Sequence, residues 1–173
     1  EAQARQARQI GEREDEIREL LGLAKRDDVN IVDDFFKFAE AMDMATSYKP
    51  VFLLALLDSV DDKGRASIAV VASKFRAFYQ ARRAATIIIE RPGAAMAAIG
   101  EMDDAAVQRV MLRMPFEKFE RRGFLRYARD VAFIEFVPAL WRRLAIEELA
   151  NLRRQCEQSI ASYYAAVANR YDT

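Results

Sequence analysis

The segment 115–136 constrains the fold most, because it predicts a short helix that leads directly into a two-stranded hairpin. Pro115 suits the first position of a helix, where its missing N–H costs nothing, and Phe116 and Phe119 fall on one helical face. Gly123 suits the left-handed residue that ends a helix. β-branched and aromatic residues then flank a polar turn. This order is the second half of a winged helix, so the sequence predicts a mostly α fold with a small β-hairpin wing.

Length and composition predict one globular, mostly helical unit. The chain has 173 residues, of which 52% are hydrophobic, with 6 glycines and 4 prolines, so it can bury a sizeable core. No apolar run approaches the roughly 18 residues that a membrane span needs, and residues 1–26 are too charged for a secretory signal. The single cysteine, Cys156, fits a buried position in a cytoplasmic protein. Because the sequence opens at Glu1 in a charged stretch, we expect a fragment of a longer polypeptide.

Apolar residues that recur every three or four positions predict the helices. We expect helices over 33–46, 50–58, 67–83, 103–114 and 145–170. The second of these is apolar on nearly all sides, which predicts a buried central helix. Residues 86–90 form a β-branched run that suits a short strand, but the pattern of 86–103 does not fix its structure.

The two ends of the chain differ in character. Residues 1–30 are rich in charge, with apolar residues spaced near seven, which fits either a solvated helical connector or a short oligomerising coiled coil. Residues 31–173 form the expected winged-helix-like domain with its long C-terminal helix. That helix carries a regular apolar stripe of Leu149, Leu152, Cys156, Ile160, Tyr163, Val167 and Tyr171. The stripe predicts packing either across the domain or against a second copy of the chain.

Charge is distributed unevenly, although the totals balance at 27 basic and 27 acidic side chains. Residues 1–47 carry 7 basic and 12 acidic side chains, whereas residues 48–146 carry 17 basic and 11 acidic ones. A local basic patch governs electrostatic binding more than the total charge does. The middle of the chain is therefore the place to look for a surface that binds a polyanion.

The sequence offers little to support catalysis. It contains no histidine, which removes the commonest general base and most zinc sites, and its glycines form no phosphate-binding loop. Four acidic pairs, at 27–28, 33–34, 61–62 and 103–104, fall at predicted caps or turns that already explain them. Asp130 and Glu135 on the hairpin lack the following lysine of a metal-dependent nuclease. We therefore expect this chain to have no catalytic residues, no metal and no cofactor.

Basic residues gather around the predicted helix and wing. The candidate nucleic-acid-binding residues are Lys118, Arg121, Arg122, Arg126 and Arg129, with Arg82 and Arg83 as an extension of the same patch. In a winged helix the first three would face the major groove, and the two wing arginines would meet phosphates. No Asn, Gln, Ser or Thr lies between them to read base edges, so phosphate contact and shape would dominate. The alternative is a solvated face, because Glu117 and Glu120 alternate with the basic residues.

The segment 47–58, Ser-Tyr-Lys-Pro-Val-Phe-Leu-Leu-Ala-Leu-Leu-Asp, followed by Phe-Arg-Ala-Phe-Tyr at 75–79, resembles a helical, winged-helix-like module of bacterial restriction and phage-defence proteins. The resemblance covers 47–171 and includes Gly-Phe-Leu at 123–125 and the paired tyrosines 163–164. It implies an accessory domain that positions DNA or a partner domain for a helicase or nuclease encoded elsewhere in the polypeptide.

These features together predict a non-catalytic accessory domain that binds DNA, duplex rather than single-stranded, through a basic helix and wing. The alternative is a protein interaction module, which docks a helicase or nuclease partner or assembles copies through the C-terminal helix. Other domains of the parent protein are expected partners in both cases, and a membrane is not.

Overall fold

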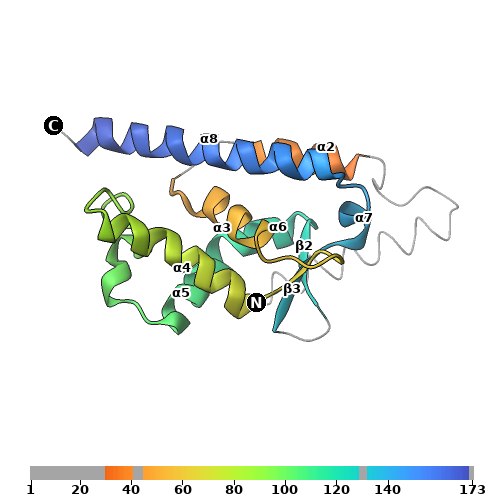
Figure 1. Cartoon of the computed structure of the whole chain (residues 1–173), viewed down its shortest axis with the longest axis horizontal. Coiled ribbons are helices and arrows are strands. Elements are labelled where there is room, and N and C mark those ends of the chain that lie inside the picture. The colour runs from red at the N-terminus through yellow and green to blue at the C-terminus, as the bar shows by residue number, and fades with distance from the viewer. Residues whose placement is uncertain (1–29, 41–44, 129–131, 172–173) are drawn as a thin grey trace, which may run out of the picture.

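The computed structural model describes residues 30–40, 45–128 and 132–171 (Figure 1). In chain order the elements are α2 (Ile31–Glu40), α3 (Tyr48–Leu57), β1 (Arg65–Ser67), α4 (Ile68–Ala84), the 3-10 helix η1 (Ala95–Glu101), α5 (Asp104–Met111), the π-helical turn η2 (Leu112–Phe116), α6 (Glu117–Arg121), β2 (Leu125–Tyr127), β3 (Phe133–Phe136), α7 (Pro138–Trp141) and α8 (Ile146–Tyr171). A mostly α fold with a small β wing and a long C-terminal helix confirms the predicted fold class. The charged helix expected within 1–30 lies outside the described residues.

The three strands form one antiparallel sheet in the order β1-β3-β2. β2 and β3 are the predicted hairpin, whereas the sequence did not predict β1. The order of α3, β1, α4, the helical segment from α5 to α6, β2 and β3 is that of a winged helix. A turn introduces β1: the Asp61 carboxylate accepts hydrogen bonds from the N–H groups of Lys63 and Arg65, each at 2.9 Å, and Gly64 adopts a φ of 73°.

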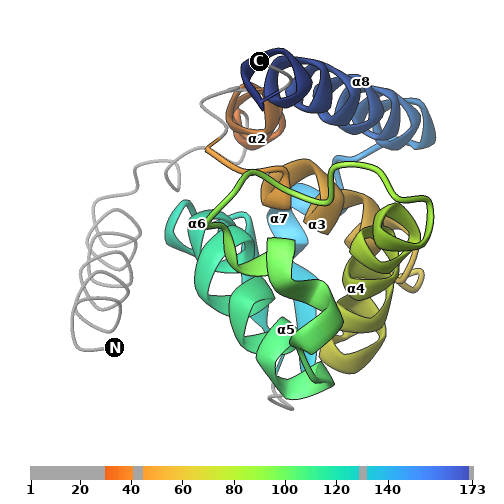
Figure 2. The ribbon, with the colours of Figure 1, turned by 90° about the vertical axis from the view of Figure 1, so that its left-hand side faces the viewer.

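Two layers make up the domain. α8 and α2 lie side by side as one layer, and α3, α4, α5 and α6 lie below it (Figures 1 and 2). α3 contacts both α8 and α4, so it is the helix of the lower layer that packs against α8. Its buried residues point to all sides of the helix and are Tyr48, Pro50, Val51, Phe52, Leu53, Ala55 and Leu56. This burial confirms the prediction that the most apolar helix is central.

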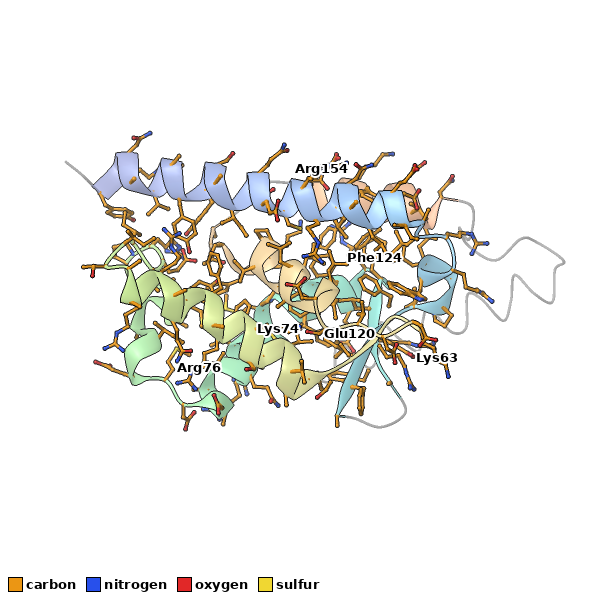
Figure 3. All side chains as sticks on the ribbon, viewed as in Figure 1. Lys63, Lys74, Arg76, Glu120, Phe124 and Arg154 are labelled. Carbon is orange, nitrogen blue, oxygen red and sulfur yellow. The ribbon has the colours of Figure 1, made fainter. Side chains whose placement is uncertain are left out.

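Phenylalanine rings join the layers to the wing. Phe35 of α2 is fully buried, and its ring centroid lies 5.3 Å from that of Phe124, 6.0 Å from that of Phe136 and 6.1 Å from that of Phe119. Figure 3 shows Phe124 beneath the layer of α8 and α2. The wing, α6 and α2 therefore share one hydrophobic core, which fixes the hairpin relative to the helices.

The stripe on α8 packs within the domain, which is the first of the two options that its sequence left open. Leu152, Cys156, Tyr163 and Val167 are buried, whereas Tyr171 is 53% exposed. Burial raises the pKa of the Cys156 thiol to about 12, as expected for a cysteine that serves as a small apolar side chain.

The helix that begins at Asp104 does not stop before Pro115. α5, η2 and α6 follow one another without a break, and Pro115 lies inside η2 rather than at the first position of a new helix, as the sequence had predicted. Proline lacks an N–H, and its ring collides with a carbonyl of the preceding turn of an α-helix; a π turn accommodates both. Pro115 and Phe116, four and five positions after the buried Met111, are both buried. We name the continuous segment 104–122, which includes Arg122 at the C-terminal cap of α6, the recognition segment.

Residues 86–90 form no strand, which corrects the prediction from their β-branched run. Thr86 has a φ of 58° and turns the chain at the end of α4. Glu90 then points into the domain, where it is 4% exposed and accepts hydrogen bonds from Ser47 and Tyr163. Side-chain contacts, rather than pairing with a neighbouring strand, therefore fix this segment.

Replacing Gly64 by alanine is expected to destabilise the domain by about 3 kcal/mol, from left-handed strain and overpacking together. A Cβ at this position would lie 2.4 Å from Cδ2 of Trp141. Gly93 is the matched control, because its φ of 83° is similar while no atom lies within 4 Å of the added Cβ. Gly93→Ala should cost only about 1 kcal/mol. Urea unfolding measures both variants, and equal losses would contradict a clash with Trp141.

Candidate nucleic-acid interface

α6 presents two neighbouring rows of charged side chains. Spacing of four residues places Lys118 and Arg122 in one row, and Glu117 and Arg121 in the next. Lys118, Arg121 and Arg122 are exposed, whereas Phe119 on the other side is fully buried. The structure thus brings the three predicted groove-facing residues together on the exposed side of α6.

Arg109 and Arg113 extend the basic surface toward the beginning of the recognition segment. Both are exposed. They lie four positions apart, as neighbours on a helix surface do. In the sequence they belong to the basic residues around the predicted helix and wing, but they are not among the predicted binding residues.

Two of the predicted arginines form exposed ion pairs. Arg121 Nε lies 3.1 Å from Glu117 Oε1, and Arg126 Nε lies 2.8 Å from Glu135 Oε1 across the hairpin. The Arg121 and Arg126 side chains are 66% and 51% exposed, whereas those of Glu117 and Glu135 are 32% and 15% exposed. Solvent-exposed pairs contribute about 0–1 kcal/mol. The Arg121 guanidinium can therefore exchange its carboxylate for a phosphate at little cost, whereas release of Arg126 leaves the largely buried Glu135 carboxylate without this partner.

The wing lies against the recognition segment. The ring of Tyr127 on β2 lies 4.9 Å from that of Phe116, measured between centroids. Tyr127 and Phe133 near the turn of the hairpin are 38% and 36% exposed. Arg129 lies outside the described residues, so its contact with phosphate stays a prediction.

The structure does not bring Arg82 and Arg83 to this surface. They lie in the last turn of α4, about 21 Å along the helix from Ile68, which directly follows β1. The Arg82 guanidinium lies 3.4 Å from the ring centroid of Tyr164, and Arg83 packs against Gly100. Arg82 thus fastens α8 to the end of α4.

Lys49 joins the surface at a point that the sequence did not predict. Its Nζ lies 4.1 Å from the ring centroid of Phe38, and the guanidinium carbon of Arg122 lies 4.9 Å from the same centroid. Burial, and then the positive charges of Lys118 and Arg122, lower the pKa of Lys49 to about 8. We name Lys49, Lys118 and Arg122 the cation cluster. No sequence signal marks Lys49, which is a lone charge in an apolar helix far from α6 along the chain.

A buried polar cluster joins the start of α3 to α4 and α8. One carboxylate oxygen of Glu90 accepts hydrogen bonds from the N–H of Ser47 at 3.0 Å and from its hydroxyl at 2.6 Å, and the other accepts from the Tyr163 hydroxyl. Because the Ser47 hydroxyl donates to Glu90, the Tyr79 hydroxyl, 2.9 Å away, donates to Ser47 Oγ. Burial raises the pKa of Tyr79 well above its usual value and that of Tyr164 to about 12, so both stay protonated at neutral pH.

An apolar hollow of about 510 Å³ lies near the polar cluster, at the end of α4 that is remote from the sheet. Its lining includes Ile87, which is 50% exposed, and Tyr171. Arg83 contributes a positive charge to its wall. This hollow is separate from the basic surface of α6.

The described residues show neither a membrane-spanning helix nor a group of metal-ligating side chains. No helix there combines the length and apolar content that crossing a lipid bilayer requires. Within the same ranges, no three His, Cys, Asp or Glu side chains come together as metal ligands do.

Comparison with known proteins found no relative of this chain. No family model matches the chain, and neither a curated protein nor a solved structure matches it.

Proposed function

We propose that this domain binds duplex DNA through the exposed side of the recognition segment and the wing. The observation that carries the proposal is that Lys118, Arg121 and Arg122 lie together on the exposed side of the segment that follows α4 in a winged-helix order. In helix-turn-helix proteins the second helix lies in the major groove, while the first crosses the backbone. α4 packs against α5 of the recognition segment, so in the proposed function α4 is the first of these two helices and the recognition segment is the second.

The charges around α6 support contact with phosphates. Arg109 and Arg113 precede the three residues along the recognition segment, and Arg126 lies on the adjoining strand. Phosphate contacts supply most of the affinity of non-specific DNA binding. With few amide or hydroxyl side chains beside these arginines, we expect affinity to depend on charge and duplex shape more than on base sequence.

We further propose that the domain is a non-catalytic accessory part of a larger restriction or phage-defence protein. The resemblance of 47–58 and 75–79 to such modules supports this role. In it, the domain holds the duplex while a helicase or nuclease domain of the same polypeptide acts on it.

The test is fluorescence anisotropy with a short labelled duplex and with one of its strands. If Lys118, Arg121, Arg122 and Arg126 each neutralise one phosphate, the logarithm of the affinity should fall with that of the salt concentration with a slope of about −3.6. Raising salt from about 50 mM to about 200 mM should then weaken duplex binding roughly 100-fold. The single strand should bind more weakly than the duplex at both concentrations.

Absence of duplex binding at low salt, or binding indifferent to salt, would contradict the proposal. That outcome would favour the protein interaction module. The apolar hollow beside Ile87 and Tyr171 would then be the first surface to test for docking of another domain.

A further inference from the structure

The apolar hollow at the end of α4 takes no part in the proposed function. In Figures 1 and 2 the C-terminal end of α8 lies above the segment that follows α4, and the hollow is lined by Tyr171 of α8, residues 86–90 and Ala97 of η1. Its volume of about 510 Å³ falls within the range of about 300–1,000 Å³ that small-molecule sites occupy. At about 30 Å³ for each water-sized group, it has room for roughly 17 such groups. The hollow is therefore large enough for an organic molecule rather than a single ion.

Branched aliphatic side chains make the wall of the hollow apolar. Ile87, Ile88 and Ile89 line it together with Pro92 and Ala97, and Ile87 is 50% exposed. The β-branched run that forms no strand therefore lends its side chains to this surface. Burying one methylene group of a ligand against such a wall strengthens binding by up to about fourfold. An aliphatic chain is thus the ligand body that the wall favours.

Hydrogen bonds hold the isoleucine segment in place before any ligand binds. Arg82 Nε donates to the Ile88 carbonyl oxygen at 2.6 Å, and the Tyr164 hydroxyl donates to that of Ile89 at 2.6 Å. The N–H of Ile87 donates to the Arg82 carbonyl oxygen at 3.2 Å. The segment is thereby tied to both α4 and α8. A ligand that enters the hollow meets a preformed wall, so little ordering entropy opposes binding.

Arg83 adds a positive charge to this wall. A Cβ added to Gly100 would lie 2.6 Å from Cζ of Arg83 and 2.9 Å from its Nη1, so the guanidinium lies against η1 where a glycine leaves room for it. The Arg83 side chain is exposed, and among the described residues no carboxylate forms an ion pair with it. The carboxylate of Glu90 in the same wall is 4% exposed and accepts hydrogen bonds from Ser47 and Tyr163 instead. The charge of Arg83 can therefore act on a ligand.

We propose that the hollow binds an aliphatic carboxylate, with its chain against the isoleucines and its carboxylate paired with the Arg83 guanidinium. Charge complementarity selects the anion, because the planar guanidinium presents N–H donors in the geometry that a carboxylate accepts. Gly100 is a positioning residue, since a larger side chain there displaces the guanidinium. The hollow is separate from the basic surface of α6, so this site does not depend on DNA binding.

The experiment titrates the isotope-labelled domain at neutral pH with decanoate, hexanoate and decylammonium, and follows the amide shifts by NMR. Decanoate should bind with a Kd of about 1 mM or lower. Hexanoate lacks four methylene groups and should bind at least about tenfold more weakly. Decylammonium has a chain of the same length with the opposite charge, and should bind about tenfold more weakly because Arg83 repels it. The shifts caused by decanoate should centre on residues 86–97.

Two variants test the role of the guanidinium. Arg83→Met keeps an unbranched side chain of similar length, and should weaken decanoate binding about fivefold and abolish the preference for the anion. Gly100→Ala keeps the charge of Arg83 but moves it, and should weaken decanoate binding by a similar factor. Arg142→Met is the matched control, because Arg142 is exposed at the end of α7 and lies outside the hollow. It should bind all three compounds as the wild type does.

Thermal melting of each variant shows that the folded domain is being compared. Equal affinity of the wild type for decanoate and decylammonium would overturn the proposal, as would shifts that centre away from residues 86–97. Decanoate binding that is unchanged in Arg83→Met would also overturn it, because the hollow would then select for apolar surface alone. A loss of decanoate affinity in Arg83→Met and Gly100→Ala, with none in Arg142→Met, would support the site.

Discussion

Glu90→Ala is expected to destabilise the domain by about 5 kcal/mol, which is enough to unfold many domains of this size. The Glu90 carboxylate accepts hydrogen bonds from the N–H and hydroxyl of Ser47, the Tyr163 hydroxyl and the N–H of Arg91. Each buried donor that loses its acceptor costs about 1–3 kcal/mol. Chemical denaturation followed by circular dichroism measures the loss.

Glu90→Gln distinguishes hydrogen bonding from packing, because it keeps the shape of the side chain. Each carboxylate oxygen of Glu90 accepts one bond from a backbone N–H, that of Ser47 on one side and that of Arg91 on the other. Either orientation of the glutamine amide therefore sets its NH₂ group against a donor that cannot reverse. We expect a loss of about 2 kcal/mol for this variant.

Glu101→Ala is the control for the removal of a carboxylate, since Glu101 is exposed at the end of η1. It should change stability by less than about 0.5 kcal/mol. If Glu90→Gln proved as stable as the wild type, the polar cluster would not hold residues 86–90 in the way the structure describes.

The sequence predicted those parts of the fold that depend on local pattern. The hairpin at β2 and β3 and the stripe on α8 follow directly from residue type and spacing, and Gly123 has the left-handed φ of 75° that the end of α6 requires. The sequence did not predict β1, because Arg65, Ala66 and Ser67 have no strand pattern of their own. They form a strand because they pair with β3. The predicted position of Pro115 at the start of a helix was wrong, because a π turn depends on which side chains the core buries. The local sequence pattern does not contain that information.

Parts of the site that lie on one short helix were also predictable. Lys118, Arg121 and Arg122 are close in sequence, so their common exposed side follows from helical spacing. Lys49 and Glu90 were not predictable, because the residues that each of them contacts are distant along the chain. Ser47 and Glu90, for example, are 43 positions apart. Arg82 was assigned to the basic patch from its charge alone, while its contact with Tyr164 depends on how α8 crosses the domain.

Reversing two charges on α6, Arg121→Glu with Arg122→Glu, is expected to weaken duplex binding about 100-fold or more at near-physiological salt. Each substitution removes a phosphate contact and places a carboxylate near the DNA backbone. The salt slope should become shallower by about 1.8, because two fewer counterions are released. Fluorescence anisotropy with the same labelled duplex measures both quantities.

The double variant should remain folded. Arg121 loses an exposed pair with Glu117, and Arg122 loses a contact with the Phe38 ring, each worth about 1 kcal/mol or less. Arg153→Glu with Arg154→Glu is the matched control, because it makes the same change of net charge at adjacent positions of a helix. Arg153 forms an exposed pair with Asp58, and Arg154 projects from α8 away from the rest of the domain (Figure 3). Equal losses of affinity in the two variants would show that total charge, and not the surface of α6, governs binding; a loss confined to the α6 variant would locate the DNA on the recognition segment.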